Sequence, residues 1–298
     1  MMKWVVALAA IAILLAIAGV VAFTSPPKLL SLIDGVAGGG AGTRRAGTAI
    51  AFGEHGQTLD VWAPEQRSEK PRPVIVFFHG GGWVKGDRAA YAFAGRAFAS
   101  RGYIVVIPDY RKVPEVRFPA FIEDGADAVR WTRDNIGRFG GDPDRIALAG
   151  HSAGAHTAVT LALDPRWLTA AGVASDTVKA AIGLSGPYDF YPFDKKRSID
   201  AMSHWPAPRD TQPIAFARAD APPMLLLTSS KDTVVRPYNT ENLTAKLREL
   251  GAPVEMENYE GLSHEEVVMA LSKPFRGKAP VLDRSVTFLE RTMAQPAG

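Results

Sequence analysis

Short runs of consecutive apolar residues alternate along the chain with segments in which apolar residues recur every three or four positions. Continuous runs, which are typical of strands buried on both faces of a parallel sheet, lie at 74–78, 104–107 and 146–149. Strands are also predicted at 179–184, 224–228 and 254–258. The periodic segments predict helices, at 122–136, 155–163, 243–250 and 282–293. Residues 48–64 predict two further short strands around a turn. This alternation predicts an α/β fold with a mostly parallel central sheet flanked by helices.

Residues 4–23 are twenty apolar or small residues without a charged side chain. A helix of that length, at about 1.5 Å per residue, spans the roughly 30 Å hydrocarbon core of a bilayer. The segment 1–23 is therefore interpreted as an uncleaved membrane anchor or as a cleaved signal peptide, and burial in a soluble core is the third alternative. Either of the first two places the rest of the chain outside the cytoplasm, tethered to the membrane or exported.

The composition changes twice more along the chain. Residues 24–47 are rich in Gly and Pro and predict a flexible linker, which leaves 48–298 as one domain. Residues 190–221 are rich in aromatic residues and Pro, with weak periodicity, and predict a lid-like insertion over the sheet.

The chain has 298 residues, a net charge of +3 and no cysteine. Because the charge is small and no Lys/Arg block is present, no nucleic-acid partner is expected. The absence of cysteine excludes disulfides, thiolate metal sites and a cysteine nucleophile. No His/Asp/Glu spacing indicates a metal site.

The segment 145–154, RIALAGHSAG, places a G-x-S-x-G pattern between a predicted strand and a predicted helix. This is the arrangement of a nucleophile elbow, in which a strained, tight turn exposes the serine hydroxyl. Gly150 and Gly154 supply the space that such a turn requires. The pattern predicts Ser152 as a nucleophile.

A serine hydroxyl needs a base that takes its proton and a carboxylate that orients that base. In an open parallel sheet such groups gather at the carboxyl ends of the strands. Asp232 follows the strand at 224–228, and His264 follows the strand at 254–258. The order Ser152, Asp232, His264 therefore predicts a catalytic triad.

The run HGGGW at 79–83 follows the first buried strand. Glycine backbone can approach a substrate closely, so the N–H groups of Gly81, Gly82 and Ala153 are predicted to form an oxyanion hole. His79 is expected to brace this loop, and His156 to be packed or solvated. Further residues are predicted to line the substrate pocket: Trp83, Tyr188, His151, His204 and Trp205.

Several motifs together resemble the α/β-hydrolase superfamily: HGGGW, PDYR at 108–111, FPA at 118–120 with the acidic pair at 123–124, and GGDPDRIALAGHSAG at 140–154. Within it the chain is most similar to bacterial carboxylesterases of the hormone-sensitive-lipase and feruloyl-esterase-like groups, and kynurenine formamidases share much of the pattern. The elbow GHSAG differs from the GDSAG typical of hormone-sensitive-lipase members and is nearer to the feruloyl-esterase and formamidase side. The resemblance implies a serine triad, a glycine-backbone oxyanion hole and no cofactor.

The expected function is hydrolysis of small or aromatic carboxylic esters through an acyl-enzyme. Two alternatives stay open at this point. An arylformamidase or other amidase would use the same residues, and a catalytically silent binding module on a membrane tether would use none of them. The sequence does not give the physiological substrate or the oligomeric state.

Overall fold

The computed structural model describes residues 25–294. Its centre is an eight-stranded sheet with the strand order β1-β2-β4-β3-β5-β6-β7-β8. β1 and β2 form an antiparallel hairpin and β2 pairs antiparallel with β4, whereas the pairs from β4 through β8 are parallel. The strands are β1 (Thr43–Phe52), β2 (Gln57–Pro64), β3 (Arg72–Phe78), β4 (Ile104–Pro108), β5 (Gly141–His151), β6 (Val178–Leu184), β7 (Met224–Ser229) and β8 (Val254–Tyr259).

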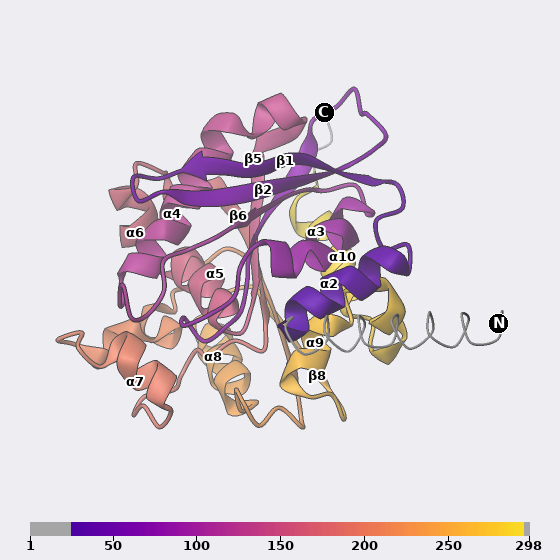
Figure 1. Cartoon of the computed structure of the whole chain (residues 1–298). Helices are drawn as coiled ribbons and strands as arrows, with labels where there is room; N and C mark the ends of the chain where they lie inside the picture. Colours follow the sequence, from indigo (N-terminus) through magenta and orange to yellow (C-terminus); the bar gives the residue numbers. More distant parts are fainter. Residues whose placement is uncertain (1–24, 295–298) are drawn as a thin grey trace, which may run out of the picture.

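Helices cover both faces of the sheet (Figure 1). One face packs against α4 (Ala120–Asn135), α5 (Ala153–Leu163), α6 (Pro165–Ala170) and α8 (Tyr238–Glu249). The other face packs against α2 (Pro26–Val36), α3 (Ala92–Ala99), α9 (His264–Met269) and α10 (Val281–Thr292). The predicted α/β architecture, with a mostly parallel sheet between two helical layers, is confirmed.

The strand β3 shows why its buried part, Val74 to Phe78, is apolar at every position. Val74, Val76 and Phe78 contribute to the core under α4 and α5. Ile75 and Phe77 contribute to the core under α3 and α10. Because successive side chains of a strand point to opposite faces, a strand covered on both sides must be apolar throughout.

The parallel register brings the carboxyl ends of the central strands to one edge of the sheet. Phe78 at the end of β3 pairs with Gly150 of β5, and His151 pairs with Leu184 at the end of β6. Leu184 in turn pairs with Leu227 of β7. The loops that follow these strands therefore meet at this edge, where open α/β sheets place their functional groups.

The prediction of a flexible linker at 24–47 is wrong. Within this segment α2 forms, and β1 begins at Thr43, before the predicted domain boundary at 48. The helix is fixed by buried polar contacts: Asp34 accepts a hydrogen bond from Arg96 Nε at 2.7 Å, and Ser31 Oγ donates to the carbonyl of Ala90 at 2.8 Å. Gly39 and Gly40, which follow the helix, lie close against the side chains of Asp34 and Arg96. A glycine-rich composition is shared by such close packing and by flexible linkers, so it does not distinguish them.

The segment 190–221 lies between β6 and β7 and contains α7 (Lys196–Met202) with two short 3₁₀ turns, Pro208–Thr211 and Pro213–Phe216. Its role as a lid stays a prediction. The apolar run at 4–23 lies outside the described residues, and across 25–294 no helix has the length and apolar character needed to cross a bilayer.

Candidate active site

Ser152 occupies the tight turn between β5 and α5. Its backbone has φ 56° and ψ −122°, which is a strained conformation for a residue with a side chain. A Cβ atom on Gly150 would clash with the carbonyl of Gly154, and one on Gly154 would clash with the carbonyl of Phe78. The two glycines therefore permit a turn that presents the serine hydroxyl at the edge of the sheet.

The structure brings Ser152, His264 and Asp232 into one hydrogen-bonded chain. His264 Nε2 lies 2.9 Å from Ser152 Oγ, and His264 Nδ1 lies 2.8 Å from Asp232 Oδ2. Because a carboxylate only accepts hydrogen bonds, Nδ1 carries the proton and Nε2 offers its lone pair to the serine hydroxyl. This arrangement can remove the hydroxyl proton and so generate a nucleophile.

Backbone contacts hold the two partners of the serine in place. The second carboxylate oxygen of Asp232 accepts the N–H groups of Val234 at 3.0 Å and Val235 at 2.8 Å. His264 is the first residue of α9, whose N-terminus is closed by a capping box between Ser263 and Glu266. The side chains of these three hydrogen-bonded residues, Ser152, His264 and Asp232, are all buried.

The glycine-rich loop after β3 lies beside Ser152. Gly81, Gly82 and Trp83 all have positive φ, at 135°, 62° and 62°. A Cβ at Gly81 would clash with the carbonyl of Lys85, so this position accepts only glycine. Ala153 is the first residue of α5, where a backbone N–H has no partner within the helix. The loop and the helix start supply N–H groups that can serve a developing oxyanion.

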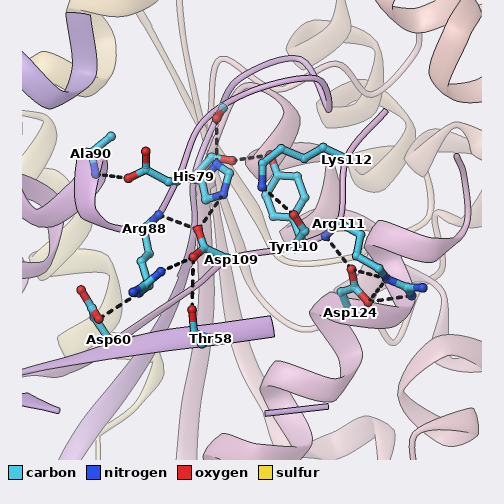
Figure 2. Close-up of polar contacts among 12 residues, drawn as sticks. Thr58, Asp60, His79, Arg88, Ala90, Asp109, Tyr110, Arg111, Lys112 and Asp124 are labelled. Carbon is cyan, nitrogen blue, oxygen red and sulfur yellow. Dashed lines mark hydrogen bonds and ion pairs between the residues drawn. The ribbon is translucent and has the colours of Figure 1, made fainter. Parts of the chain in front are cut away.

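His79 braces this loop and stands apart from Ser152. Its Nδ1 donates to the carbonyl of Gly80 at 2.8 Å, and its ring stacks on Tyr110 with centroids 4.3 Å apart. The Tyr110 hydroxyl donates to the carbonyl of His79 at 2.9 Å. Burial lowers the pKa of His79 to about 4 and so keeps it neutral near pH 7. Figure 2 shows His79 beside Asp109, with Arg88 between Asp109 and Asp60.

A small pocket of about 60 Å³ opens at Ser152. Trp83 lines it, as predicted, and so do Gly82 and Ala153. Phe190 from the 190–221 segment also lines the pocket and stacks on Trp83, with ring centroids 5.9 Å apart.

Four of the predicted pocket residues lie elsewhere. Tyr188 is fully buried against the backbone of Gly183 and Gly186, because glycine there leaves room for its ring. His204 binds the carbonyl of Phe118 at 2.9 Å, and Trp205 packs edge-on against the ring of Phe118. Both are therefore directed toward the loop before α4 and away from the pocket.

His151 lies behind the histidine of the triad. Its Nε2 donates to the carbonyl of His264 at 3.2 Å, which leaves Nδ1 to accept from the Tyr91 hydroxyl at 2.9 Å. Burial, and then the nearby charge of His264 when protonated, lower its pKa well below the usual value. His151 therefore supports the backbone of His264 as a neutral residue and does not line the pocket.

Sequence reasoning missed two arginines that line the pocket, Arg197 on α7 and Arg236 after β7. Both lie in segments without helical or strand periodicity, so no pattern singles them out. His156 packs edge-on against Trp83 and binds the carbonyl of Thr211, as the expected packed residue.

A protein-family comparison matches the BD-FAE family over residues 59–247, which is more than half of the chain. The chain belongs to the BD-FAE family. It is 35% identical over 211 residues to esterase LipC of Mycobacterium tuberculosis, covering 64% of this chain and 52% of that protein. It is 29% identical to the isoprenylcysteine alpha-carbonyl methylesterase ICME of Arabidopsis thaliana, covering 77% of this chain and 58% of that protein. The chain thus spans a little over half the length of these relatives.

Solved structures give the same fold for this member of the family. Esterase 2 of Thermogutta terrifontis, phosphonylated by sarin, superposes with a TM-score of 0.71 at 21% identity, covering 86% of this chain and 98% of that one. The hyperthermophilic esterase from the archaeon Pyrobaculum calidifontis superposes with a TM-score of 0.71 at 24% identity, covering 90% and 92%. The fold is that of the α/β hydrolases.

Proposed function

We propose that this protein is a serine carboxylesterase in which Ser152 is the nucleophile, His264 the base and Asp232 the residue that orients the base. The observation that carries the proposal is the continuous hydrogen-bonded chain from Ser152 Oγ through His264 to Asp232 Oδ2. The esterase names of the relatives in the same family support it.

In the proposed reaction, Ser152 Oγ attacks the ester carbonyl carbon while His264 Nε2 takes the hydroxyl proton. The N–H groups of Gly81, Gly82 and Ala153 stabilise the oxyanion, and each such donor is worth about 10²–10³ in rate. The intermediate then releases the alcohol, to which His264 returns the proton, and leaves Ser152 acylated. Water, deprotonated by His264, attacks the acyl group and frees the acid.

We also propose that the pocket favours small or aromatic esters. Trp83 and Phe190 lie on it as stacked rings, which offers an apolar surface to a flat group. The insertion at 190–221 would act as the lid over this surface.

Labelling with a fluorophosphonate probe tests the chemistry. The folded wild type is expected to be labelled and to hydrolyse 4-nitrophenyl esters, and Ser152→Ala is expected to lose both properties. Ser203→Ala, an exposed serine of the insertion, is the matched control and keeps both. A folded wild type that is not labelled would instead support a silent binding module, and faster turnover of an N-formyl aryl amide than of any ester would support an amidase.

We propose, finally, that residues 4–23 anchor the domain outside the cytoplasm, or direct its export. The uninterrupted apolar run supports this proposal. Membrane fractionation and sequencing of the mature N-terminus test it: an intact N-terminus in the membrane fraction is expected for an anchor and a new N-terminus near residue 23 for a cleaved signal. An intact N-terminus in the soluble fraction contradicts both.

A further inference from the structure

The pocket at Ser152 carries an excess of positive charge. Three basic residues line it, Lys195, Arg197 and Arg236, and Asp194 is its one acidic lining residue within 25–294. Asp194 is 69% exposed and lies 3.6 Å from Lys195, so it is already paired and faces solvent. The two arginines are left as the uncompensated charges of the pocket.

Neither arginine has an acidic partner among the described residues. The carboxylates near Arg197 in sequence are taken by lysines, Asp194 by Lys195 and Asp200 by Lys196. Elsewhere on the molecule, arginines do bind carboxylates closely, as Arg166 binds Asp164 at 2.7 Å. Other arginines within 25–294, such as Arg44 and Arg248, also lack a carboxylate partner. Arg197 and Arg236 differ from these because they line the pocket at Ser152.

Arg197 is held against the glycine-rich loop. A Cβ atom built on Gly82 would lie 2.7 Å from Arg197 Cδ and 3.4 Å from its Nη1, so the arginine stem packs directly on the glycine. The helix that carries Arg197 is tied down, because the carbonyl of Ala201 accepts the N–H of Phe118 at 2.9 Å. The guanidinium thus stays beside the backbone that is proposed to bind the oxyanion.

Arg236 is tied to the triad through its backbone. Asn239 Nδ2 donates to the carbonyl of Arg236 at 3.1 Å, and Asn239 Oδ1 accepts the N–H of Tyr188 at 3.0 Å. The preceding turn is held by Asp232, which binds the N–H groups of Val234 and Val235. The backbone position of Arg236 is therefore set by the carboxylate that orients His264, while its side chain is exposed at the pocket.

We propose, on the basis of the serine-esterase function above, that the substrate is an ester bearing a second, anionic group, a carboxylate or a phosphate, which Arg197 and Arg236 bind. A guanidinium presents a planar fork of N–H donors that matches either anion. The aromatic pair Trp83 and Phe190 holds the uncharged part of the molecule, while the arginines fix its charged end. This makes Arg197 and Arg236 specificity-determining residues.

Three matched substrates test the proposal: the 4-nitrophenyl monoester of glutaric acid, the analogue with a terminal phosphonate, and the neutral methyl 4-nitrophenyl glutarate. The wild type is expected to show a kcat/KM about 10-fold higher for one of the anionic esters than for the neutral one. The anionic ester with the higher kcat/KM identifies the anion that the two arginines bind. The preference is expected to fall as salt is added, because salt screens partly exposed charges.

Arg197→Gln and Arg236→Gln are each expected to lower the ratio of kcat/KM for the anionic ester to kcat/KM for the neutral ester by about 3-fold, so that the two together account for the roughly 10-fold preference. Lys196→Gln is the matched control: it removes the same charge from the same helix, but Lys196 is 86% exposed and does not line the pocket. Equal kcat/KM for charged and neutral esters in the wild type, or an equal loss in Lys196→Gln, overturns the proposal. Failure to hydrolyse even the neutral ester contradicts the esterase function instead.

Discussion

Two histidines at the carboxyl end of the sheet face a carboxylate, and only one of them also faces a hydroxyl. His264 lies 2.8 Å from Asp232 and 2.9 Å from Ser152. His79 lies 3.7 Å from Asp109, and its Nδ1 is bound to the carbonyl of Gly80. The residue types are the same, but the hydrogen-bond geometry differs.

The neighbouring backbone decides which ring nitrogen carries the proton. In His79 the carbonyl of Gly80 requires the proton on Nδ1, so Nε2 offers a lone pair toward Asp109 and cannot donate to it. Asp109 is satisfied by Arg88, whose N–H and guanidinium bind its two oxygens. In His264 the carboxylate itself takes the Nδ1 proton. A His–Asp pair is therefore a candidate base only where the carboxylate is the acceptor.

The largest effect is expected from a substitution that breaks the His264–Asp232 pair. Asp232→Asn lets the side-chain amide donate to Nδ1, which moves the imidazole proton to Nε2 and removes the acceptor of the serine proton. We expect kcat on a neutral 4-nitrophenyl ester to fall by about 10³–10⁴-fold. The thermal unfolding temperature serves as the control for folding, and a kcat within tenfold of the wild type would exclude Asp232 from the triad.

The second effect concerns the pH dependence of stability. Burial lowers the pKa of His79 and of His156 from 6.5 to about 4. Between these values the unfolded chain binds protons that the folded chain does not, so the free energy of unfolding falls as the pH is lowered from 6.5 to about 4. Protonation of each of these two imidazoles lowers the free energy of unfolding by up to about 3 kcal/mol.

Urea unfolding at a series of pH values measures this loss, and His156→Gln is the informative variant. Its free energy of unfolding is expected to fall less steeply over that range, because one titrating imidazole is absent, while His79 and His151 still contribute. A variant curve parallel to that of the wild type would show that His156 is not held neutral by the fold.

A smaller effect is expected from the equivalent substitution in the His79–Asp109 pair. Asp109→Asn removes the charge that binds Arg88 and is expected to cost about 1–3 kcal/mol of unfolding free energy. Because Asp109 does not orient a base, kcat is expected to stay within about tenfold of the wild type. The same chemical change is thus expected to lower stability at Asp109 and turnover at Asp232. A kcat loss as large as that of Asp232→Asn would show that His79 takes part in proton transfer.

The smallest effect is expected at Tyr110. Tyr110→Phe removes the hydroxyl that donates to the carbonyl of His79 and keeps the ring that stacks on the imidazole. The loss is expected to be about 1 kcal/mol of unfolding free energy, measured by urea unfolding. An unchanged stability would mean that the stacking, and not the hydrogen bond, holds His79 in place.

The sequence by itself determined where the strands and the elbow lie along the chain. A strand covered on both faces must be apolar throughout, and a turn as tight as that at Ser152 requires glycine on either side. The identities of Asp232 and His264 as partners also followed, because a parallel sheet brings the residues after its strands to one edge.

Only the tertiary structure decided what surrounds that edge. Asp34 is buried by Arg96, which lies 62 residues further along the chain, so the segment with the composition of a linker is a docked helix. Tyr188 and His151 were expected in the pocket and are buried beside it, whereas Arg197 was missed and lines it. The physical reason is common to Asp34, His151 and Arg197: each position is set by a partner distant in sequence, and local patterns report only the periodicity and the turns of the chain around them.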